Sequence, residues 1–173
     1  MIFALAFYVA ACFLLAMAAL NDWRGMQIPN KYATALLGLF VFGLLVPRHY
    51  FGGVTLMGGL VAGLLVFVIT FFFYAIKAMG AGDTKLASAT AFLVGMTHLG
   101  AFLMGMAVTG GVLAAYALLV RKHPRFLPVA SDTNPTAWLS QLHAGTNKLP
   151  YGIAIAVGGA IALALRWIAP LFS

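Results

Sequence analysis

Acidic side chains are almost absent from this chain, which has three aspartates among 173 residues and no glutamate. Charged residues of both signs make up only 8% of the sequence, too few for the surface of a soluble globular protein. Cys12 is the only cysteine, which excludes an intrachain disulfide and a cysteine-cluster zinc site. The short alternating segments of a membrane β-barrel are missing as well.

Apolar residues, in contrast, are abundant. They form 64% of the chain, and the mean hydropathy is +1.03. Uninterrupted runs of about 18 or more apolar residues are typical of helices that cross a membrane. The length of 173 residues suits one domain. We therefore predict a single all-α integral-membrane domain over residues 1–173.

Glycine, proline and polar residues divide the apolar sequence into segments. One of these, residues 86–120, would form a helix of about 52 Å, whereas a bilayer core is about 30 Å thick. Two short helices with a turn near residues 95–100 fit better, which makes six transmembrane helices in total. The other four expected helices are residues 2–20, 32–46, 54–76 and 151–168.

The basic residues indicate how these helices are oriented. The net charge of +7 would suggest nucleic-acid binding in a soluble protein, but here lysines and arginines flank apolar runs. With six helices, connections 21–31, 77–85 and 121–150 share one face and carry eight of the ten basic residues. We predict that this face is cytoplasmic, that both termini lie outside, and that the partners are membrane lipids and not nucleic acid.

The longest connection, residues 121–150, contains a possible interfacial helix. Asp132 is expected to cap its start. Trp138, Leu139 and Leu142 would then form an apolar stripe lying on the membrane surface.

The other two aspartates, Asp22 and Asp83, fall on the same predicted face. Asp83 follows Gly80 and Gly82, and glycines permit backbone angles and close approaches that larger residues do not. Ionisable groups at membrane depth are costly and usually mark a functional site. Two neighbouring carboxyl groups in a low dielectric cannot both ionise easily, so one keeps a proton. Such a pair can activate a water molecule and polarise a peptide carbonyl.

Other interpretations of these residues stay open at this level. Each aspartate could cap a helix or stabilise a turn. The two could also be relay groups of a small proton-coupled transporter or channel, or caps in a non-enzymatic assembly subunit. Lys85 could neutralise Asp83, contact a substrate, or extend towards lipid headgroups. Asn30, after Pro29, is a plausible cap for the second helix.

No metal site is expected, because none of the four histidines has a suitably spaced partner. The sequence also lacks a Ser-His-Asp signature and a phosphate-binding loop. The histidines are His49, His98, His123 and His143.

Three segments of the chain carry short motifs. Gly80-Ala81-Gly82-Asp83 is a GxGD sequence and is followed by Lys85. Asp22-Trp23-Arg24 has Ile28-Pro29-Asn30 downstream, and the stretch from Leu149 to Ala154 opens the final expected helix. Together these segments resemble the GxGD motif, the first-aspartate segment and the start of the final helix of the type IV prepilin peptidases, a family of membrane aspartyl proteases.

The resemblance implies an aspartic endopeptidase of the bacterial inner membrane, with Asp22 and Asp83 as its two catalytic aspartates. Such enzymes remove the short basic leader of a prepilin at the cytoplasmic membrane face, without metal or organic cofactor. The paired cysteines of the larger, methylating members are missing from this chain. It therefore resembles the short, protease-only form that serves Flp or tight-adherence pili, and methyl transfer is not expected. Archaeal preflagellin peptidases share the motif and remain an alternative.

Overall fold

The structure is a computed structural model and describes residues 2–46, 55–122, 138, 142 and 149–167. Within these residues the chain is helical and contains no strand, so the predicted all-α class is confirmed. The helices are α1 (Ile2–Gly25), α2 (Asn30–Leu45), α3 (Leu56–Ala75), α4 (Ala81–Lys122) and α6 (Tyr151–Trp167).

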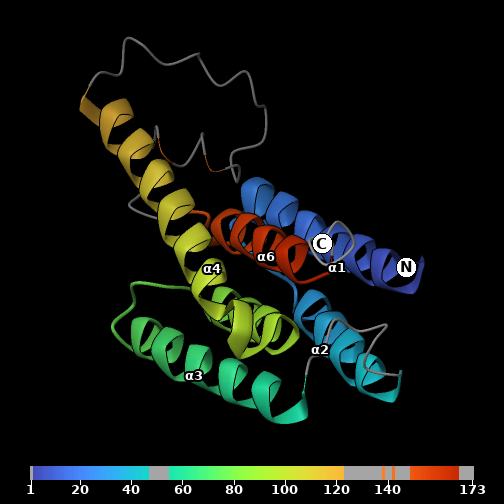
Figure 1. The fold of residues 1–173 in the computed structure, drawn as a ribbon. Coiled ribbons are helices and arrows are strands. Elements are labelled where there is room, and N and C mark those ends of the chain that lie inside the picture. The colour runs from blue at the N-terminus through green and yellow to red at the C-terminus, as the bar shows by residue number, and fades with distance from the viewer. Residues whose placement is uncertain (1, 47–54, 123–137, 139–141, 143–148, 168–173) are drawn as a thin grey trace.

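Helix α6 lies between α1 and α4. It packs against α1 on one side and α4 on the other, while α2 and α3 both pack against α4 (Figure 1). Paired glycines allow α4 and α6 to pack closely: a Cβ on Gly158 would lie 2.6 Å from the carbonyl oxygen of Phe102. A Cβ on Gly105 would lie 2.8 Å from the Cα of Gly158. Small residues of this kind let transmembrane helices approach backbone to backbone.

Helix α4 is interrupted at Gly95, where φ is 69° and ψ is 173°. This backbone conformation is accessible essentially only to glycine. Figure 1 shows the two parts of α4 meeting at an angle, so the expected break within residues 95–100 is confirmed.

The break at Gly95 exposes carbonyl groups that have lost their helical partners, and Arg166 of α6 occupies that position. Its Nη1 donates hydrogen bonds to the carbonyl oxygens of Leu93, at 3.3 Å, and Val94. Arg166 is only 5% exposed. A cation at the C-terminal end of a helix is favourable because the helix dipole is negative there. Arg166 thus stabilises the bend.

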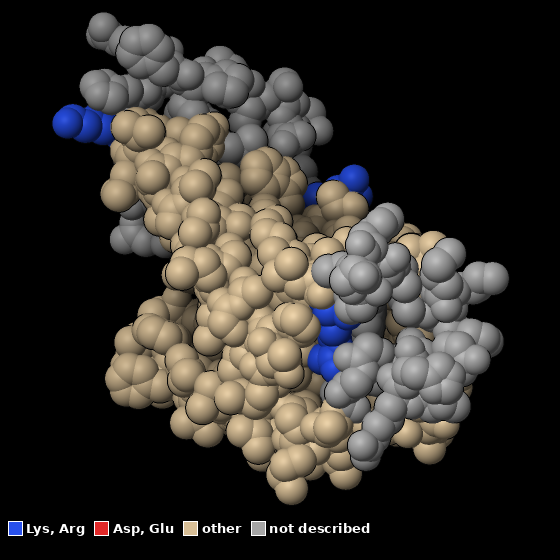
Figure 2. All heavy atoms as spheres, in the orientation of Figure 1, with Lys and Arg blue, Asp and Glu red and all other residues tan. Residues whose placement is uncertain are grey.

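The surface of the bundle is strongly apolar. Three helical stretches are long and apolar enough to cross a membrane, namely Leu5–Gly25, Leu56–Ala75 and Ala81–Val120. Helices α2 and α6 are apolar but shorter. Figure 2 shows a face composed mainly of uncharged residues, with few basic groups and no visible acidic one. These features are those of a membrane protein; the six crossings and the orientation of the termini stay predictions.

Several helix ends differ from the expected ones. Helix α1 continues to Gly25, about one turn beyond residue 20, so Asp22 belongs to the helix and not to the loop after it. Asn30 is the first residue of α2 and not its cap, because the cap position is occupied by Pro29. Helix α4 begins at Ala81, five residues before the expected start, which brings Asp83 into its first turn.

The connection between α4 and α6 is described only in small part, and Asp132 and Leu139 lie outside the described residues. Trp138 and Leu142 are helical, as expected, but they are buried against the protein, at 1% and 3% exposure, and do not face the membrane surface. Trp138 packs edge-on against Trp23 of α1, with ring centroids 5.1 Å apart. The expected lipid-facing stripe is therefore wrong for these two residues, because a protein surface at the ends of α1 and α4 covers them.

Candidate active site

Asp22 lies in the last turns of α1 with its carboxyl group turned into the protein. It is 4% exposed. Its Oδ2 accepts a hydrogen bond of 2.8 Å from the backbone N–H of Gly152, in the first turn of α6. The first N–H groups of a helix have no intrahelical partner, and the helix dipole there is positive. Asp22 therefore satisfies the start of α6, and α6 in turn holds the carboxyl group of Asp22 in place.

Gly152 is required for this contact. A Cβ at position 152 would lie 2.9 Å from the Cβ of Asp22, 2.9 Å from its Oδ2 and 2.9 Å from Cδ1 of Ile28. Real Cβ atoms do not approach other atoms so closely, so any side chain larger than hydrogen would displace Asp22 or Ile28. The absence of a side chain at position 152 thus allows α6 to reach the carboxyl group.

Asp83 lies in the first turn of α4. Its Oδ2 accepts a hydrogen bond of 3.1 Å from the backbone N–H of Gly80, the residue just before the helix. An acidic side chain that reaches back in this way helps to cap a helix. The other oxygen, Oδ1, is buried and has no hydrogen-bond partner among the described residues. Capping therefore accounts for one carboxyl oxygen of Asp83 and leaves the second without a structural role.

The two glycines before Asp83 act by their small size. Neither has a positive φ, since Gly95 is the only glycine with positive φ among the described residues. A Cβ on Gly80 would lie 2.8 Å from Oδ2 of Asp83, and a Cβ on Gly82 would lie 3.0 Å from the carbonyl oxygen of Ile28. The expectation of unusual backbone angles is wrong here, and the expectation of close approach is confirmed.

Asp22 and Asp83 line the same cavity, which has a volume of about 430 Å³. The structure thus brings together the two aspartates that the distribution of basic residues predicted to lie on one face of the membrane. The other residues that line this dyad cavity are Met26, Tyr74, Lys77, Ala78, Met79, Gly80, Leu149 and Tyr151.

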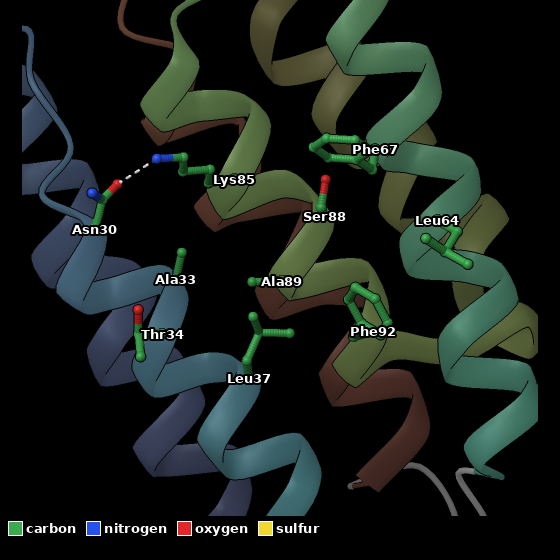
Figure 3. Close-up of a pocket in the computed structure, with 10 residues that line it drawn as sticks. All are labelled: Asn30, Ala33, Thr34, Leu37, Leu64, Phe67, Lys85, Ser88, Ala89 and Phe92. Atoms are coloured by element: carbon green, nitrogen blue, oxygen red, sulfur yellow. Dashed lines mark hydrogen bonds between the residues drawn. The ribbon is translucent and has the colours of Figure 1, made fainter.

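Lys85 lies on α4 near Asp83 but does not line the dyad cavity. Its Nζ donates a hydrogen bond of 3.1 Å to Oδ1 of Asn30, at the start of α2 (Figure 3). The pair joins the first turns of α2 and α4. Pro29 precedes α2 with an extended backbone and forms no side-chain cap.

The described residues contain no cluster of three or more histidine, cysteine or acidic side chains able to hold a metal ion. Two carboxyl groups and one adjacent cavity can instead perform acid–base chemistry on a bound substrate.

The family model of the type IV leader peptidases matches residues 8–115, more than half of the chain. The chain belongs to the type IV leader peptidase family. This leader peptidase contains both cavity aspartates within the matched segment, whereas α6, with Gly152 and Arg166, lies beyond it. No curated protein and no solved structure matches the chain.

One residue at the site, Gly152, and one at the bend of α4, Arg166, were not predicted from the sequence, where Gly152 is only part of a resemblance and Arg166 only a charge. Both act over long separations along the chain, since 130 residues separate Gly152 from Asp22 and 72 separate Arg166 from Val94. The single arginine within the final apolar segment was the one available signal, because a charge inside a membrane helix usually has a buried partner.

Proposed function

We propose that the peptidase is an aspartic endopeptidase that removes the leader of type IV prepilins, with Asp22 and Asp83 as a catalytic pair. The observation that carries this proposal is the shared cavity: the two aspartates come from α1 and α4 and line one space. Membership of the leader peptidase family supports the reaction class.

The proposed reaction uses the two carboxyl groups as a unit that shares one proton, so neither is assigned a fixed role. The ionised member accepts a proton from water as the water oxygen attacks the peptide carbonyl carbon. The protonated member donates a hydrogen bond to the carbonyl oxygen. The carbon–nitrogen bond then breaks, and a proton passes to the leaving amine. The free Oδ1 of Asp83 suits this chemistry, because the protein does not use it elsewhere in the described structure.

The proposed substrate is a precursor with a basic leader followed by an apolar helix. The helix would lie in the bilayer beside the peptidase, and its junction with the leader would reach the dyad cavity. We further propose that the site faces the cytoplasm across the inner membrane of a bacterium, because the connections predicted to share its face carry eight of the ten basic residues. Precursors of the Flp or tight-adherence type are the proposed class, and archaeal preflagellins are the alternative.

A proton-coupled transporter is the other class of function to test. It requires carboxylates accessible from both sides of the membrane, whereas here the pair lines one cavity near the first turns of α4 and α6. This arrangement favours hydrolysis at one face.

The test uses purified peptidase in liposomes with a purified prepilin, and mass spectrometry to detect the released leader. Asp22→Asn and Asp83→Asn preserve side-chain size, and each is expected to slow cleavage by about 10³-fold or more, the range for loss of acid–base catalysis. Asp132→Asn is the matched control and should cleave at the wild-type rate. If both cavity variants still cleave the prepilin, the assignment of Asp22 and Asp83 as the catalytic pair is wrong. Proton flux that depends on the aspartates, without cleavage, would favour transport.

A further inference from the structure

A second cavity shares no lining residue with the dyad cavity. It forms a groove between α2 and α3, with α4 as its floor, and has a volume of about 480 Å³ (Figure 3). The residues that line this α2–α3 groove are Asn30, Ala33, Thr34, Leu37, Leu64, Phe67, Lys85, Ser88, Ala89 and Phe92.

The groove is apolar along most of its length. Leu37, Leu64 and Phe67 remain 38%, 56% and 41% exposed on its walls, so the groove opens on the apolar surface of the bundle. The hydroxyl of Ser88 on the floor already donates to the carbonyl oxygen of Thr84, at 2.7 Å. The interior of the groove therefore suits a hydrocarbon chain.

One end of the groove is polar and positively charged. Figure 3 shows Lys85 and Asn30 there, joined by their hydrogen bond, with the aliphatic side chains farther along. That bond uses one of the three N–H donors of the Lys85 ammonium group, and the partner amide carries no charge. The acidic residues of the described chain, Asp22 and Asp83, line the dyad cavity instead. The positive charge at this end thus faces no acidic residue that lines the groove.

We propose that the α2–α3 groove binds an anionic phospholipid, with one acyl chain along the groove and the phosphate at Lys85 and Asn30. Charge complementarity selects this occupant, because a basic group at the bilayer surface attracts anionic headgroups. The lipid would fill the space between α2 and α3, which both pack against α4, the helix that carries Asp83 in its first turn. The site is independent of the proposed peptidase chemistry.

The test uses native mass spectrometry of peptidase released from mixed vesicles of phosphatidylglycerol and phosphatidylcholine. Wild-type protein should retain phosphatidylglycerol in preference. Lys85→Gln should reduce that preference about fivefold, the effect of one basic group near the membrane surface. Lys31→Gln is the matched control, because Lys31 is also exposed at the start of α2 but does not line the groove. It should leave the preference unchanged.

A second pair of variants tests the acyl-chain position. Thr34→Phe adds bulk at an exposed position on the groove wall and should reduce retention of both lipids. Thr97→Phe, at an exposed position outside the groove, should not. The proposal is overturned if Lys85→Gln and Lys31→Gln have equal effects, which would indicate diffuse surface charge. It is also overturned if Thr34→Phe changes nothing, or if a prepilin displaces the retained lipid in proportion to its concentration, which would make the groove a site for the precursor.

Discussion

The two ends of the first part of α4 show opposite uses of a buried charge. At the start, the carboxyl group of Asp83 lies beside a cavity that Asp22 also lines, and its Oδ1 has no partner within the described structure. At the break, the guanidinium of Arg166 donates to the carbonyl oxygens of Leu93 and Val94. Helix α6 contributes to both ends, through the N–H of Gly152 and through Arg166.

The difference lies in what each charge faces. Nη1 of Arg166 contacts protein carbonyls at the bend and supports the fold. The aspartates line a cavity, where a bound substrate can reach them. A buried charge that contacts backbone is expected to affect stability, whereas one that faces a cavity is expected to affect activity.

Replacing Arg166 should cause the largest loss of stability. Arg166→Met leaves the carbonyl groups at the bend without their donor, and we expect the free energy of unfolding to fall by about 3 kcal/mol, the upper range for unsatisfied buried polar groups. Denaturation by SDS in mixed micelles measures this loss. The cleavage rate per folded molecule should remain near wild type.

The matched control for this variant is Lys122→Met, which removes an exposed charge at the end of α4. It should unfold at the wild-type SDS concentration. A large loss of cleavage by folded Arg166→Met protein would contradict the division between a structural end of this helix segment and its proposed catalytic end.

Gly152→Ala should reduce activity more than stability, the reverse of what is expected for Arg166→Met. The added methyl group would push against Asp22 and Ile28, and a displacement of about 1 Å in a reacting group costs about 100-fold in rate. We therefore expect kcat/KM to fall about 100-fold, with a smaller change in unfolding. Gly100→Ala is the control, since a Cβ at that position meets nothing within 4 Å. Equal activities of the two variants would show that the contact with α6 does not position Asp22.

Gly95→Ala tests the bend itself. The backbone angles at Gly95 suit only glycine, and a Cβ there would lie 3.0 Å from Nη1 of Arg166. The expected loss is about 2 kcal/mol of unfolding free energy. Denaturation of the double variant with Arg166→Met should show less than the sum of the two losses, because both act on the same contact. If the two losses of unfolding free energy add fully, Arg166 does not stabilise the bend at Gly95.

Lys85→Gln should have the smallest effect in detergent. Its hydrogen bond to Asn30 is exposed, and surface substitutions usually change stability by no more than about 0.5 kcal/mol. Cleavage in detergent should stay within about threefold of wild type. A much larger loss would give Lys85 a role in the site that neither its position outside the dyad cavity nor its bond to Asn30 indicates.

Much of the framework was predictable from sequence because it depends on local properties. Apolar runs predicted the helices, the excess length of residues 86–120 predicted a break, and the charge distribution placed Asp22 with Asp83. The exact ends of α1 and α4 were not predicted, because polar residues such as Asn21 and Asp22 continue a helix when tertiary contacts satisfy them. Asn21, for example, donates hydrogen bonds to the carbonyl oxygen of Met17, at 2.8 Å, and the hydroxyl of Tyr32, at 2.6 Å.

The contacts of α6 were beyond local reasoning. The sequence around a glycine in an apolar helix does not indicate which carboxylate its N–H will bind. An arginine near a helix end is equally typical of an anchor in the lipid headgroup region. Only the packing of α6 between α1 and α4 reveals that both residues act on distant segments. The catalytic roles of Asp22 and Asp83 remain predictions that the cleavage assay tests.

The bond between Gly152 and Asp22 also has a consequence for biosynthesis. Both aspartates have been synthesised by the time the ribosome has passed residue 83, but the partner that holds Asp22 belongs to α6, about 70 residues later. A nascent chain that has inserted only its first helices therefore contains Asp22 and Asp83 but lacks the hydrogen bond from Gly152 that holds Asp22 in place. With the proposed catalytic pair, proteolytic competence is expected to appear only when α6 packs into the bundle, so translation itself delays the activity until α6 has been made.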